Sequence, residues 1–182
     1  MKYQNIGYPE QRAVLGRRRF LRIAVLGGGA SLLAIASPGQ APRAAGKAEA
    51  ILLSCMDYRL IDETGRYMSQ RGLRNNYDHV ILAGAALGPL TEKHPAWAKT
   101  FWEHLDVAID LHSIQKVIVL DHRDCGAYEV ILGEDFAKNP TKETEVHTSK
   151  LRELRKQILT KRPKLSVELL LMSLDGKVAT IT

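Results

Sequence analysis

Apolar residues fall into two patterns along the chain after residue 49. Short unbroken runs of aliphatic residues alternate with longer segments in which apolar residues recur every three or four positions. Short runs are typical of buried strands, whereas the longer spacing indicates helices with one apolar face. The runs predict strands at residues 50–54, 79–83, 116–121 and 165–174. The longer segments predict helices at residues 61–71, 97–112, 126–132 and 145–161.

Strands that alternate with helices indicate an α/β fold with a parallel sheet. Residues 117–120 are all apolar, so both faces of that strand require cover, as in a sheet with helices on its faces. We therefore expect a mostly parallel sheet of about four strands flanked by helices. A glycine-rich loop is expected at residues 84–89, and a turn at Asp175-Gly176 leaves residues 177–182 for a short edge strand.

Positive charge is concentrated near the N-terminus. The whole chain carries a formal net charge of +6, and residues 1–36 contribute +5 of it, because they contain six lysines and arginines and one acidic residue, Glu10. The remainder is almost neutral and has no basic footprint for nucleic acid. We expect no nucleic-acid partner.

The N-terminal segment has the features of an export signal. Arg17 and Arg18 resemble a twin-arginine pair, and residues 23–36 follow without any charge but are too few to span a bilayer comfortably. We interpret residues 1–36 as a twin-arginine-type signal and residues 37–48 as a flexible spacer before a domain at residues 49–182. This predicts a periplasmic or extracytoplasmic protein that meets the membrane only through its signal, with an uncleaved anchor as the alternative.

Polar residues with metal-binding side chains follow two of the predicted strands. Cys55 and Asp57 come after one strand, and His122 and Cys125 come after another. Because the carboxyl ends of parallel strands share one edge of a sheet, we expect these side chains to converge there. Two thiolates and an imidazole form a three-ligand zinc set with an open fourth position, for which the carboxylate of Asp57 is a candidate.

Other interpretations of the same residues remain open at this point. Two cysteines in an exported protein can form a disulfide, although the neighbouring aspartate, arginine and histidine favour a metal. Alternation in an extended chain would point Cys55, Asp57 and Arg59 to one side, yet an Asp–Arg pair is also a common surface ion pair. We expect the remaining histidines to be structural or exposed: His79, His94, His104, His112 and His147.

Cys55-x-Asp57-x-Arg59 and His122-x-x-Cys125-Gly126 together resemble the two signatures of the β-class carbonic anhydrases. The resemblance implies zinc-dependent, reversible hydration of carbon dioxide to bicarbonate through a zinc-bound hydroxide, with Cys55, His122 and Cys125 as ligands. It implies that Asp57 orients the hydroxide while paired with Arg59, and that Asp57 binds zinc and closes the site when released. It further implies a homodimer or a higher even oligomer.

The sequence departs from that family's pattern at two places. Family members carry an Arg-Asn-Ala-Gly-Asn type loop where this chain has Leu-Ala-Gly-Ala-Ala at residues 82–86. They usually have glycine before the histidine and a small hydroxyl residue after it, where this chain has Asp121 and Arg123. With Asp124, these charged residues either tune the ligands or narrow the pocket mouth.

The altered loop motivates a second hypothesis, a zinc hydrolase of a carbon dioxide analogue such as carbon disulfide or carbonyl sulfide. A third is a non-catalytic binding domain stabilised by zinc or by a disulfide.

Overall fold

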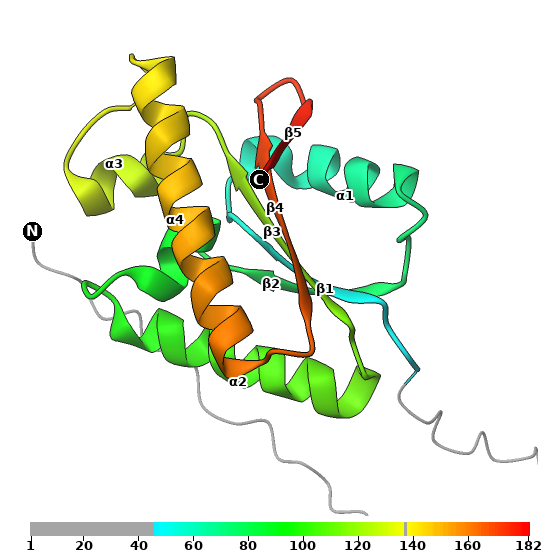
Figure 1. Ribbon diagram of the computed structural model, residues 1–182. Coiled ribbons are helices and arrows are strands. Elements are labelled where there is room, and N and C mark those ends of the chain that lie inside the picture. The colour runs from blue at the N-terminus through cyan, green and yellow to red at the C-terminus, as the bar shows by residue number, and fades with distance from the viewer. Residues whose placement is uncertain (1–45, 137) are drawn as a thin grey trace, which may run out of the picture. The chain divides into compact units, whose positions relative to one another are not determined.

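The computed structural model describes residues 46–136 and 138–182, and the expected signal at residues 1–36 and most of the spacer lie outside them. The described part forms a five-stranded sheet in the order β2-β1-β3-β4-β5 (Figure 1). The strands are β1 Ala50–Ser54, β2 Tyr77–Ile81, β3 Lys116–His122, β4 Ser166–Met172 and β5 Val178–Ile181. The first four are parallel, and β5 pairs with β4 in the antiparallel sense.

Helices cover the two faces of the sheet (Figure 1). On one face, α2 (Pro95–His112) and α4 (Pro140–Lys161) pack their apolar residues against Ile51, Leu53, Val117 and Val119. On the other face, α1 (Ile61–Gln70) places Met68 against side chains at the alternate strand positions. This alternation follows from the two-residue period of a strand and explains why the central strands read as unbroken apolar runs.

The strand register places the ends of β1 and β3 side by side. Ser54 is paired with Leu120, so the residues that follow β1 lie next to the end of β3. The strand β3 continues through His122 before the chain turns into α3 (Gly126–Leu132). Because both strands run in the same direction, their polar continuations meet at one edge, the usual ligand edge of an open α/β sheet.

The structure confirms the mostly parallel sheet flanked by helices, and β5 confirms the short edge strand expected within residues 177–182. Several expected bounds were wrong by a few residues. The helix expected to start at residue 145 begins at Pro140, because the side chain of Asn139 accepts a hydrogen bond from Lys142 N and caps the helix at that point. The loop expected at residues 84–89 is mostly a 3-10 helix, η3 (Ala85–Leu90), which begins after Gly84 at φ +74°.

Within the part of the chain that the structure describes, no helix combines the length and apolar character needed to cross a membrane.

Candidate metal centre

Cys55, His122 and Cys125 meet at the carboxyl edge of the sheet. Cys55 directly follows β1, His122 is the last residue of β3, and Cys125 is the residue before α3. Their sulfur and nitrogen atoms all lie within 4.8 Å of one another. The convergence expected from the parallel strands is therefore present, and the group could hold a metal ion.

The spacing of the two sulfur atoms fits a tetrahedral metal. Both cysteines are free thiols, and their Sγ atoms lie 3.8 Å apart. Two thiolates that each sit about 2.3 Å from a tetrahedral zinc ion would be separated by about 3.8 Å. The disulfide alternative therefore does not describe this structure.

The imidazole of His122 is oriented to offer one nitrogen to the same point. Its Nδ1 lies 2.8 Å from the carbonyl oxygen of Arg123, and because a carbonyl only accepts, Nδ1 is the donor. In the neutral imidazole Nε2 then carries the lone pair, and among the described residues it is buried without a hydrogen-bond partner. A buried polar atom in this condition requires an explanation, and ligation of a metal ion would supply one.

The surroundings of Cys55 favour its thiolate form. The hydrogen bond from the Cys125 thiol is the main factor that lowers the pKa of Cys55 to about 4, against the opposing effect of burial, and His122 and the Gly84 amide add to it. The Gly84 N–H donates to Cys55 Sγ at 3.3 Å. The same pairing and burial raise the pKa of Cys125. Burial lowers the pKa of His122, but the neighbouring Cys55 outweighs it and raises that pKa overall.

Asp57 and Arg59 form a bidentate ion pair beside the three side chains. Arg59 Nε donates to Asp57 Oδ1 at 2.9 Å and Arg59 Nη2 donates to Asp57 Oδ2 at 2.7 Å. These contacts lower the pKa of Asp57 to about 2. The carboxylate also lies 3.7 Å from His122 Nε2, so it borders the candidate metal position.

The expectation that Asp57 and Arg59 share an extended chain was wrong. Residues Tyr58–Leu60 form the 3-10 helix η2, and the Asp57 side chain caps it by accepting from Arg59 N at 3.0 Å. A capping aspartate satisfies an otherwise unpaired amide at a helix start. The turn brings the arginine back onto the aspartate that precedes it, which strand alternation would not do.

Asp124 is a second carboxylate on the same arginine. Arg59 Nη1 donates to Asp124 Oδ2 at 2.6 Å, and Arg59 Nη2 donates to the Asp124 carbonyl oxygen at 2.8 Å. Asp124 has φ +54°, a left-handed conformation that is uncommon for residues other than glycine. Its amide donates to the buried carboxylate of Glu143 on α4 at 2.6 Å.

Asp121 lies behind the site as the centre of a buried hydrogen-bond network. It accepts from the Ala86 amide at 2.9 Å, from the Tyr128 hydroxyl at 2.6 Å and from His147 Nδ1 at 2.8 Å. These contacts tie η3, α3 and α4 to the end of β3, next to His122. Of the two roles left open for Asp121, the structure excludes narrowing of the pocket mouth, because the residue is 1% exposed.

A mostly apolar pocket of about 360 Å³ opens over the candidate metal position. Its lining includes Cys55, Asp57 and Cys125 together with the apolar side chains of Trp97 and Val130. His94 also lines the pocket, with its ring stacked on Trp97 at a centroid distance of 4.1 Å. His94 was expected only to be structural or exposed, because no spacing in the sequence links it to the strand ends.

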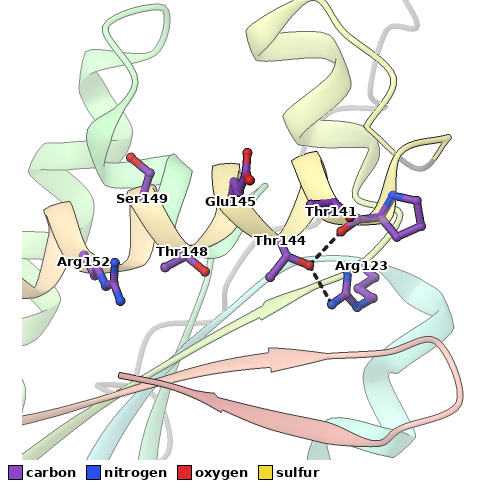
Figure 2. A pocket seen from close by; sticks show the side chains of 8 residues that line it. Arg123, Thr141, Thr144, Glu145, Thr148, Ser149 and Arg152 are labelled. Atoms are coloured by element: carbon purple, nitrogen blue, oxygen red, sulfur yellow. Dashed lines mark hydrogen bonds between the residues drawn. The ribbon is translucent and has the colours of Figure 1, made fainter.

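Arg123 turns away from this pocket. Its guanidinium donates to Glu143 and to the Thr144 hydroxyl, at the end of an open groove along α4 that Figure 2 shows. The groove also carries Thr148 and Arg152. Arg123 therefore does not narrow the mouth of the metal pocket, and its contact with Glu143 supports the segment between His122 and Cys125.

Two of these contact residues, Glu143 and His147, could have been identified from the sequence. Glu143 and His147 continue the buried face of α4 formed by Leu151, Leu154 and Ile158, at helical spacing. Polar residues on an otherwise apolar helix face require buried partners. The partners are Asp124 and Arg123 for Glu143, and Asp121 for His147.

Comparisons with known proteins agree with this geometry. The family described as "Putative carbonic anhydrase" matches residues 45–182. An uncharacterized protein of Rickettsia bellii (strain RML369-C) is 44% identical over 135 residues, which cover 74% of this chain and 82% of the relative.

Solved structures share the fold at low identity. The β-carbonic anhydrase isoform I of Trichomonas vaginalis matches with a TM-score of 0.50 and 19% identity, over 74% of this chain and 84% of that one. A tetrameric β-carbonic anhydrase of Sordaria macrospora matches with a TM-score of 0.50 and 10% identity, over 75% and 81% of the two chains. The structural matches establish the fold, and the match over residues 45–182 establishes that the chain belongs to the carbonic anhydrase family so described.

Proposed function

We propose that this protein is a zinc-dependent enzyme that reversibly hydrates carbon dioxide to bicarbonate. The observation that carries the proposal is the Nε2 atom of His122, which has no hydrogen-bond partner among the described residues and is buried next to two free thiols that line an apolar pocket. Family membership supports it at the level of the reaction class. The residue types present are those of an open catalytic zinc site, with three protein ligands.

Cys55, His122 and Cys125 would hold the zinc ion. Bound zinc would supply Lewis acidity that makes a water molecule at the fourth position a good nucleophile near neutral pH. The Gly84 amide donates to the Cys55 sulfur, which favours the thiolate form that ligation requires. The carbonyl of Arg123 fixes the ring orientation of His122.

Asp57 and Arg59 would position the attacking water. While both carboxylate oxygens of Asp57 accept from Arg59, the aspartate stays ionised and can also accept a hydrogen bond from that water. Released from Arg59, the same carboxylate would occupy the fourth position and close the site. The 3.7 Å separation of Asp57 Oδ2 from His122 Nε2 supports this second role, because it shows that the carboxylate already borders the ligand group.

The apolar walls suit a small, linear and uncharged substrate. Trp97 and Val130 offer no charge to retain a polar molecule, whereas bicarbonate is charged and would leave toward solvent. Apolar walls also limit the water that competes around the site.

A second candidate substrate is carbon disulfide or carbonyl sulfide. The observation that favours it is η3, where Ala85, Ala86 and Leu87 are all buried and the segment brings no polar side chain to the site. A softer, less polar substrate would lose little binding energy beside a segment without polar side chains.

Zinc content and turnover, measured together on the purified full-length chain, test the proposal. We expect one zinc per chain and stopped-flow hydration of carbon dioxide. The variant Asp57→Ala should keep zinc and lose at least about tenfold in turnover. Asp175→Ala is a matched control, because Asp175 is an exposed residue paired with Lys177 on the β4–β5 turn.

Each other outcome has a definite meaning. Stoichiometric zinc with sulfide release but no hydration would favour the analogue hydrolase. Zinc without either activity would favour a binding domain. Full activity in Asp57→Ala would remove that residue from the mechanism.

We also propose that the protein acts as a homodimer or a higher even oligomer. Three apolar side chains near the pocket mouth are largely exposed, with Met56 at 65%, Tyr58 at 82% and Val130 at 77%. Exposed apolar residues clustered in this way are typical of interaction surfaces. Light scattering on the purified chain would test this, with a monomer as the contradicting result.

Export by the twin-arginine route to the periplasm or another extracytoplasmic compartment remains part of the proposal. Arg17 and Arg18 support it. Replacing both by lysine should retain the protein in the cytoplasmic fraction of cells that otherwise export it, and unchanged export would contradict the assignment.

A further inference from the structure

Arg59 is shared between two carboxylates, and the proposed mechanism uses only one of them. Asp57 accepts from its Nε and Nη2 atoms, while Asp124 accepts from its Nη1 and Nη2 atoms through a carboxylate and a carbonyl oxygen. Asp124 lies between His122 and Cys125 in the sequence, so it belongs to the segment that carries two candidate ligands.

A hydrogen bond to Glu143 on α4 holds Asp124 in its position. Its left-handed backbone, at φ +54°, is held by the hydrogen bond from its amide to Glu143, whose side chain is 5% exposed. Glu143 is itself paired with Arg123 at 2.8 Å. Uncommon backbone conformations persist where the surroundings enforce them, often at functional sites. Here the result is that both the carboxylate and the carbonyl of Asp124 face Arg59.

We propose that Asp124 is a positioning residue that holds Arg59 in place and competes with Asp57 for it, so that it sets how readily Asp57 leaves Arg59 for the fourth metal position. This inference rests on the proposed function, since it concerns the closing step of the same site. When Asp57 departs, Arg59 still has a carboxylate and a carbonyl as partners. The arginine therefore does not become an unpaired charge, and the cost of releasing Asp57 is reduced.

Substitution by asparagine separates charge from shape at this position. Asparagine tolerates a left-handed backbone and can still accept from Arg59 Nη1, so the fold and the anchor remain. The competing negative charge is lost, and Arg59 should hold Asp57 more tightly. The side chains of Arg59 and Asp124 are 33% and 47% exposed. Loss of the charge interaction in a pair this exposed should change the equilibrium between Asp57 on Arg59 and Asp57 at the metal position by about twofold to fivefold.

The experiment measures access to the fourth position without turnover. The full-length protein is loaded with cobalt(II), and azide is titrated while the visible absorption of the metal is recorded. Asp57→Ala is used first, to find a fixed pH at which azide binds that variant at least tenfold more tightly than the wild type. At this pH, Asp124→Asn should bind azide about twofold to fivefold more tightly than the wild type, and the exposed control Asp175→Asn should not differ.

The outcomes separate the two proposals. If Asp57→Ala and the wild type bind azide alike at every pH, Asp57 does not compete for the metal, and the closing step of the proposed function fails. If Asp57→Ala binds more tightly but Asp124→Asn matches the wild type or binds more weakly, the role of Asp124 is overturned while Asp57 keeps its own.

Discussion

Replacing Asp121 by alanine would remove the acceptor of three buried hydrogen bonds. The donors are the Ala86 amide, the Tyr128 hydroxyl and the Nδ1 atom of His147, and the side chain of Asp121 is 0% exposed. Because a carboxylate only accepts, His147 must carry its proton on Nδ1. In the alanine variant all three donors would face a small cavity that contains no hydrogen-bond acceptor.

The magnitude follows from counting these donors. A buried donor without a partner costs about 1–3 kcal/mol, so three would cost about 3–9 kcal/mol. Removal of a buried charge returns part of this, and we expect a loss of about 3–5 kcal/mol in the free energy of unfolding. Asparagine should cost about 1 kcal/mol or less, because its oxygen can accept from Ala86 while its amide donates to Tyr128 and to His147 in the other tautomer.

Urea denaturation of the metal-free protein, followed by circular dichroism, measures both values. Asp175→Ala is the control and should lie within about 0.5 kcal/mol of the wild type, because its ion pair is exposed. The reasoning fails if Asp121→Ala costs less than about 1 kcal/mol, or if the alanine and asparagine variants cost the same.

Three further predictions concern the ligand group and η3. Cys125→Ser should lose stoichiometric zinc in elemental analysis, since the site would keep two ligands, and one retained zinc per chain would refute the ligand assignment. The raised pKa of Cys125 keeps that thiol protonated near neutral pH, so zinc binding should release its proton and should weaken as pH falls. Calorimetry of zinc binding in two buffers of different ionisation enthalpy measures the protons released, and a value of zero would contradict this prediction. Gly84→Ala should destabilise the protein by about 1–2 kcal/mol in urea, because φ is +74° and the added carbon would lie 3.3 Å from Leu87, whereas Gly65→Ala in α1 meets nothing within 4 Å and should not destabilise.

The parallel sheet and the meeting of Cys55, His122 and Cys125 could be predicted from the sequence. Both follow from local rules: unbroken apolar runs indicate parallel strands, and parallel strands end at one edge. These rules fix which residues lie at the edge without any knowledge of the helices. The same rules failed at Arg59, where a capping hydrogen bond replaced the extended backbone that alternation assumes.

The contacts from α4 could not be predicted in the same way. Spacing shows that Glu143 and His147 belong to a buried helix face, but it does not show which strand residues they meet. That depends on how the helix is seated on the sheet, which is decided by packing across segments far apart in the sequence. The pairs Glu143–Asp124 and His147–Asp121 therefore became visible only in three dimensions.

The two departures from the family pattern, at residues 82–86 and at Asp121, are coupled in the structure. The turn around η3 has no polar side chain of its own to secure it, and the carboxylate of Asp121 secures it instead by accepting from the Ala86 amide. The same turn presents the Gly84 amide to the Cys55 sulfur. A glycine at residue 121 would remove this support while the apolar turn remained, so the Gly84 amide would lose its fixed position. An apolar η3 thus requires a buried acceptor on β3, and the charged residue before His122 is explained by the turn that packs against it.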